Sequence, residues 1–149
     1  MPSQDPDASG EPKDDPPHAA PPPLSGGQLL ATISTTIVAI MREHYGRGPM
    51  RAKTYLMDDI IVCVLRGSGF TPLEQTIMDD NGADRVVAMR HEFQRLVADR
   101  YTEAIERLTG RTVLAFLSQA HVDPDVTMEM FIVDGPLEGF RAVEMLHPE

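Results

Sequence analysis

The stretch that decides the fold is residues 50–67, MRAKTYLMDDIIVCVLRG, which predicts two strands joined by a tight turn. Polar and apolar residues alternate over residues 50–56, as in a strand with one buried face. Residues 60–66 are apolar at every position except the last, so both faces of this strand should be covered by helices, another sheet or a second subunit. Asp58 and Asp59 favour a turn, because Asp side chains hydrogen-bond to nearby backbone groups.

A helix is predicted before this hairpin, over residues 25–45. Ser25 and Gln28 have the spacing of a capping box at its start. Gly46 should end the helix because glycine adopts the left-handed conformation at no steric cost, and Pro49 prevents the helix from resuming. The apolar residues that recur at helical spacing are Leu29, Ile33, Ile37, Ile40 and Met41.

Two helices are predicted after the hairpin. Thr71 and Glu74 form a second capping box, and Pro72 occupies the first position of a short helix that ends near Asp79. A long amphipathic helix follows over about residues 83–108. Its apolar stripe is expected at Val86, Met89, Phe93, Leu96, Val97, Tyr101, Ala104, Ile105 and Leu108.

A second hairpin completes the pattern, with strands over residues 112–119 and 126–134 and a turn around Asp123-Pro124-Asp125. The order of helix, hairpin, helix pair and hairpin predicts an α+β fold, with helices packed on one face of a four-stranded antiparallel sheet. This single domain spans residues 25–134, and residues 135–149 form a C-terminal extension with weak periodicity.

Composition is uneven along the 149 residues. Residues 1–24 hold eight of the thirteen prolines, five acidic residues and one lysine, which predicts a disordered acidic tail. The net charge of −10 argues against nucleic-acid binding. No apolar run is long enough to span a bilayer, and no secretory signal is expected. Cys63 is the single cysteine, and we expect it to be a buried apolar residue in a cytoplasmic protein.

Basic residues gather where the first helix ends and the first strand begins. Arg51 and Lys53 lie on the same side of the predicted strand as Tyr55, because side chains alternate along a strand. Together with Arg42 and Arg47 they could form a cationic patch that binds a small anion or an acidic partner. The alternative is that these charges only protect an edge strand from pairing.

Motifs of catalysis are missing, so no enzymatic activity and no cofactor is expected. His121, Asp123 and Asp125 are spaced like metal ligands, but Pro124 marks a polar turn, and no metal site is predicted. One alternative function remains open, an enzyme that uses Asp58, Asp59 and His121 as its acid and base groups.

The run that begins with Gly46-Arg47-Gly48-Pro49 resembles the MpsC-like family of small bacterial domains. The resemblance covers roughly residues 26–134 and includes the strand pair around Asp58-Asp59 and the run Thr71-Pro72-x-Glu74. The chain departs from the family pattern by inserting Ser68-Gly69 and by carrying Phe70 in place of a leucine. Read physically, the glycines, the proline, the turn Asp and the capping residues are structural.

The family is labelled after a sodium-translocating membrane-potential-generating system, and some members are linked to inorganic-carbon uptake. The resemblance therefore implies a non-enzymatic accessory or regulatory subunit, cytoplasmic and held at the membrane by a transport complex. Homodimerisation is also expected, because the second strand is apolar on both faces. A stress-response or transcription-linked adaptor that recruits partners through residues 1–24 is the other alternative.

Overall fold

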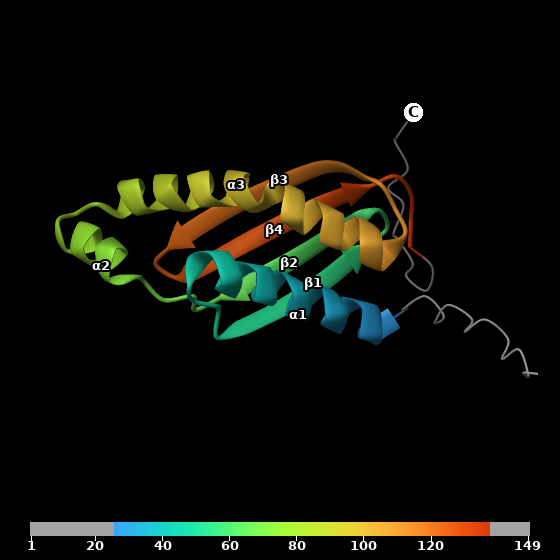
Figure 1. The fold of residues 1–149 in the computed structure, drawn as a ribbon, viewed down its shortest axis with the longest axis horizontal. Coiled ribbons are helices and arrows are strands. Elements are labelled where there is room, and N and C mark those ends of the chain that lie inside the picture. Colours follow the sequence, from blue (N-terminus) through green and yellow to red (C-terminus); the bar gives the residue numbers. More distant parts are fainter. Residues whose placement is uncertain (1–25, 138–149) are drawn as a thin grey trace, which may run out of the picture.

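The computed structural model describes residues 26–137, so the predictions for residues 1–25 and 138–149 lie outside the described residues. These include the acidic tail, the Ser25 cap and most of the C-terminal extension. The elements follow the predicted order (Figure 1). They are α1 (Gly26–Tyr45), β1 (Arg51–Met57), β2 (Ile60–Arg66), α2 (Pro72–Asp79), α3 (Ala83–Thr109), β3 (Val113–Val122) and β4 (Asp125–Val133).

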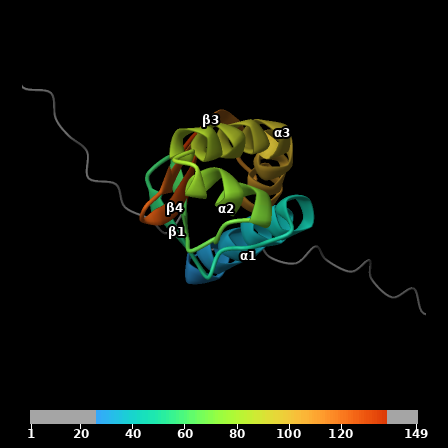
Figure 2. The same ribbon diagram turned by 90° about the vertical axis from the view of Figure 1, so that its left-hand side faces the viewer.

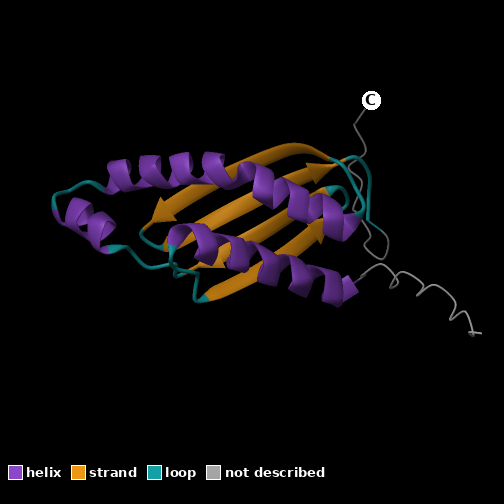
Figure 3. Cartoon of the chain, in the orientation of Figure 1, coloured by secondary structure: helices purple, strands orange, loops and turns teal. Residues whose placement is uncertain are grey.

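The four strands form one antiparallel sheet in the order β1-β2-β4-β3, so the two hairpins meet through β2 and β4. Helices α1 and α3 cross the strands on the same face of this sheet (Figure 3). The view along the layers separates the strands from the two helices (Figure 2). The predicted α+β fold is therefore confirmed.

The hydrophobic core lies between the helices and the sheet. All five apolar residues predicted for the first helix are buried there. Strand β2 contributes Ile61, Cys63 and Leu65, which are each fully buried, as expected for Cys63. None of the helices within residues 26–137 combines the length and the apolar character needed to cross a membrane.

Local signals set the element ends. Thr71 Oγ1 accepts a hydrogen bond from Glu74 N at 3.2 Å, and Glu74 Oε1 accepts one from Thr71 N at 2.9 Å, which confirms the capping box. Asp58 adopts a left-handed φ of 59° in the β1–β2 turn. Gly46 follows α1 with φ of 79°, and Gly110 caps α3 with φ of 69°. The capping box, the Asp58-Asp59 turn and the end of the helix at Gly46 were each predicted from residue type alone.

The predicted apolar stripe of the long helix is wrong at two positions. Met89 and Leu96 are 40% and 75% exposed, whereas Arg90 and Gln94 are 4% and 3% exposed and face the rest of the domain. Val86, from the same predicted stripe, is fully buried, so hydrophobicity placed the stripe correctly there but misassigned Met89 and Leu96. Arg90 belongs to an ion-pair cluster and Gln94 lines a small cavity, both of which are described below.

Candidate functional site

No element within residues 26–137 covers the face of the sheet opposite α1 and α3 (Figure 2). Strand alternation and register place sixteen side chains on this surface, which we call the open face. Eleven of them are apolar and none is acidic, which is unusual for a chain with a net charge of −10. They are Arg51, Lys53, Tyr55, Met57, Ile60, Val62, Val64, Arg66, Ala115, Leu117, Gln119, His121, Val126, Met128, Met130 and Ile132.

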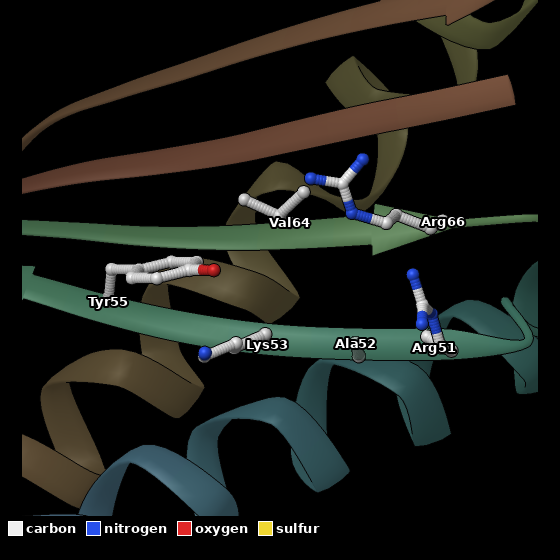
Figure 4. Close-up of a pocket in the computed structure, with 6 residues that line it drawn as sticks. All are labelled: Arg51, Ala52, Lys53, Tyr55, Val64 and Arg66. Atoms are coloured by element: carbon white, nitrogen blue, oxygen red, sulfur yellow. The ribbon is translucent and has the colours of Figure 1, made fainter. Parts of the chain in front are cut away.

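The positive charges of the open face lie at one end. Arg51 of β1 pairs with Arg66 of β2, and Lys53 lies one step further along its strand face. Together with Tyr55 and Val64 they line a hollow of about 450 Å³ (Figure 4). Lys53 Nζ lies 5.1 Å from the centroid of the Tyr55 ring, a cation–π contact. Within residues 26–137, none of the three cations forms an ion pair, so their charge is available to an anionic partner.

The four predicted basic residues do not form a single patch. Arg51 and Lys53 share the open face with Tyr55, as the strand period predicts. Arg42 instead lies on the helix side of the sheet, because α1 packs against the opposite face of β1. Arg47 reaches across to the loop before α2, where its Nη1 donates a hydrogen bond to the Phe70 carbonyl. The anion-binding set predicted from sequence is therefore divided by the sheet.

Sequence reasoning missed Arg66, although a signal for it was present. A two-residue turn at Asp58-Asp59 fixes the pairing of the flanking strands. Counting outward from that turn places Arg66 directly opposite Arg51, the pair found in the structure.

The Gly-Arg-Gly-Pro segment fits its surroundings for steric reasons. A Cβ atom at Gly48 would lie 2.4 Å from Arg42 Nε, so a larger residue there would displace the Arg42 side chain. Gly46 has a positive φ, which favours glycine. Pro49 is buried next to Met50, whose backbone N–H donates to the Gly67 carbonyl and ties the loop to the end of β2.

A buried ion-pair cluster lies at the end of the sheet nearest α2. Arg90 Nε is 3.0 Å from Glu74 Oε2, and Arg90 Nη1 is 3.0 Å from Asp125 Oδ1. Arg90 Nη2 donates to the Gly69 carbonyl at 2.8 Å. Burial raises the pKa of Glu74, but hydrogen bonds from Arg90 and the Thr71 backbone outweigh it, so the net pKa is lowered. Since each guanidinium nitrogen is engaged, we interpret this cluster as a structural tie.

The residues of the alternative enzyme site are not brought together. Asp58 and Asp59 form the turn at one end of the β1–β2 hairpin. His121 pairs with Val126, which pairs with Arg66 at the other end of the sheet, about 20 Å away at the usual rise per residue. Within residues 26–137, no three His, Cys, Asp or Glu side chains gather as a metal-binding group.

Comparison with known families adds one finding. The family model described as Na+-translocating membrane potential-generating system (MpsC) matches residues 25–135. The chain belongs to the MpsC family. The resemblance predicted from the Gly-Arg-Gly-Pro segment and the capping box is thereby confirmed, and the open face of this MpsC-family chain lies within the matched region. No curated protein and no solved structure matches the sequence.

Proposed function

We propose that this MpsC-family protein is a non-enzymatic accessory or regulatory subunit that docks on a membrane cation-transport complex through its open face. The observation that carries the proposal is an apolar sheet face that, within residues 26–137, has three unpaired cations at one end and no acidic side chain. The family description supplies the setting, a sodium-translocating system that generates membrane potential. In this setting the protein is cytoplasmic and reaches the membrane through its partner.

The apolar part of the open face has the character of an interface. Tyr55, Met57, Leu117 and Met128 are 43%, 57%, 47% and 40% exposed on it. The four strands lie about 4.8 Å apart, and the two shortest have 7 residues. At about 3.3 Å per residue, this shared length gives a surface of roughly 400 Å² before side-chain relief is added. Standard interfaces bury about 800 Å² per partner, so the open face can supply the apolar centre of one.

The cationic end selects the chemistry of the partner. An acidic group on the transport complex would be attracted to Arg51, Lys53 and Arg66 but repelled by most of this acidic chain. Such complementarity fixes orientation and speeds association more than it adds affinity. Because these charges are exposed to solvent, we expect docking to weaken as the salt concentration rises.

Site-specific photo-crosslinking in native membranes tests the docking surface. A crosslinker in place of Tyr55 should capture a subunit of the transport complex, whereas one in place of the exposed Leu96 on α3 should not. Replacing Arg51 and Arg66 with glutamate, which reverses their charge, should abolish capture of the transport subunit. Reversing Arg85 and Arg107, two exposed arginines of α3, makes the same charge change elsewhere and should leave capture intact. Capture of only a second copy of the chain would replace this proposal with a homodimer.

A small anion is the second candidate ligand for the same cations. The supporting observation is the hollow of about 450 Å³ that Arg51, Lys53 and Arg66 surround. Titration calorimetry with bicarbonate or phosphate should give a measurable Kd, and replacing both arginines with alanine should raise it.

The adaptor alternative depends on residues 1–24. Partner binding that survives their deletion contradicts that alternative.

A further inference from the structure

Unpaired polar atoms concentrate between α3 and strands β3 and β4. Eight buried side-chain polar atoms in residues 26–137 lack a hydrogen-bond partner, and six of them lie in this one region. Buried polar groups are normally paired, so such a concentration indicates a place where something other than this protein supplies the partners. The six atoms are His91 Nε2, Gln94 Oε1, Tyr101 OH, Ser118 Oγ, Glu129 Oε1 and Glu129 Oε2.

Glu129 is the charged member of this group. It is 0% exposed on the helix side of β4, and its neighbours across the sheet are Cys63 of β2 and Ser118 of β3. It forms no ion pair within residues 26–137. Burial raises its pKa to about 8, and the nearby Ser118 hydroxyl only partly opposes this. A cation placed beside Glu129 would restore the carboxylate.

A small cavity lies between α3 and β3, and Gln94 and Ser118, two of the residues with unpaired polar atoms, line it. Its volume of about 160 Å³ is room for about five water molecules or a ligand of a few heavy atoms. Ser118, which lines the cavity, is the cross-strand neighbour of Glu129 on the same face of the sheet. The lining residues are His91, Gln94, Arg95, Ala98, Phe116 and Ser118.

The geometry points to a ligand class. We propose that this cavity binds a small protonated primary amine, with its ammonium group beside Gln94, Ser118 and Glu129. Three N–H donors match the carboxylate and amide oxygens, which can only accept hydrogen bonds. One positive charge balances one carboxylate, whereas a divalent ion would leave a buried net charge. Ala98 and the ring of Phe116 provide an apolar wall for the short alkyl body.

Binding would transfer one proton to solvent. At neutral pH the free site holds Glu129 as the acid, and the bound ammonium stabilises the carboxylate, so the carboxyl O–H bond breaks as the amine enters. The facing groups are Cys63 of β2, whose pKa burial raises to about 11, and Tyr101 of α3, whose pKa burial also raises. His91 and Arg95 of α3 line the cavity. The affinity for the ammonium ion should therefore rise as the pH increases through about 8.

This site is independent of the proposed docking function. Glu129 projects from the helix side of β4, whereas Met128 and Met130 project from the open face. Charge reversal of Arg51 and Arg66 should leave amine binding unchanged, so failure of one proposal is distinguishable from failure of the other.

Thermal unfolding and calorimetry of the full chain at pH 8.5 test the site. Methylammonium or ethylammonium chloride should raise the Tm by about 5 °C at ten times the Kd. Two reference salts are tested at the same ionic strength. Sodium chloride supplies a cation that is not an amine, and tetramethylammonium chloride supplies an ammonium ion of the same charge without N–H donors. An equal Tm rise in either reference salt would overturn the proposal.

Variants locate the ligand. Glu129→Gln should weaken methylammonium binding at least ten-fold, and Gln94→Leu should weaken it while keeping the site buried. Glu103→Gln removes a carboxylate from the exposed surface of α3, the helix that carries Gln94, and this variant should bind methylammonium as the wild type does. Undiminished binding in Glu129→Gln contradicts the proposal. Should that variant fail to fold, undiminished binding in Gln94→Leu contradicts it instead.

Discussion

Replacing Glu129 with glutamine removes a titratable group that is fully buried under α3 while keeping nearly the same shape. Burial raises the pKa of this carboxyl group to about 8 in the folded protein, from an ordinary value of 4.5. The folded state thus holds the proton more tightly than the unfolded state. The stabilisation that this proton gives to the folded state is fully present below about pH 4.5 and is lost as the pH rises through about 8.

The size of this effect follows from the same two pKa values. Each pH unit between them changes the free energy of unfolding by about 1.4 kcal/mol, so the total loss is on the order of 5 kcal/mol. That is a large part of the roughly 5–15 kcal/mol that holds a typical domain together. Glu129→Gln should abolish the loss, because glutamine does not titrate.

Urea unfolding between pH 5 and pH 9, in buffers free of amines, measures the effect. The difference in the free energy of unfolding between the wild type and Glu129→Gln should change by several kcal/mol between pH 5 and pH 9. The change should favour the variant at high pH. Glu103→Gln is the control for loss of an exposed carboxylate on α3. A difference between wild type and Glu129→Gln that stays constant from pH 5 to pH 9 would refute the reasoning.

Four further substitutions test stability, and their effects can be read from urea midpoints. Arg90→Leu leaves the buried carboxylate of Glu74 and the partly buried one of Asp125 without their cation, and should cost about 3–5 kcal/mol. A loss below 1 kcal/mol would mean that water replaces the guanidinium. Gly82→Ala should cost about 1–3 kcal/mol, because the new Cβ would lie 2.4 Å from the Ile77 carbonyl oxygen. Gly27→Ala, with no atom within 4 Å of its new Cβ, should be neutral or stabilising. Thr71→Ala removes the acceptor of the α2 cap and should cost about 1 kcal/mol.

Local features of this protein could be predicted because the physics behind them is local. The capping box at Thr71 begins α2, and Gly110 ends α3. Both act through hydrogen bonds and torsions within a few residues. The two-residue turn at Asp58-Asp59 aligns β1 with β2, and this register alone places Arg51 opposite Arg66. Together with the strand period, which places Lys53 beside Arg51, this register made all three cations of the open face accessible before any tertiary structure was known.

The buried side of each element was not accessible in this way. In β4, Val126, Met128, Met130 and Ile132 form the more apolar side, yet they lie on the open face, while Thr127 and Glu129 point into the interior. A hydrophobicity rule would have oriented this strand the other way, as it misplaced Met89 and Leu96 in α3.

By itself, the sequence determined the order and kind of the helices and strands, how the first hairpin aligns, and which side chains of an element share a face. Only the tertiary structure decided which of those faces met the helices. It separated Arg42 from Arg51 across the sheet, left the open face uncovered within residues 26–137, and enclosed Glu129. The physical reason is that periodicity relates residues of one element to each other, whereas burial depends on how all the elements pack at once.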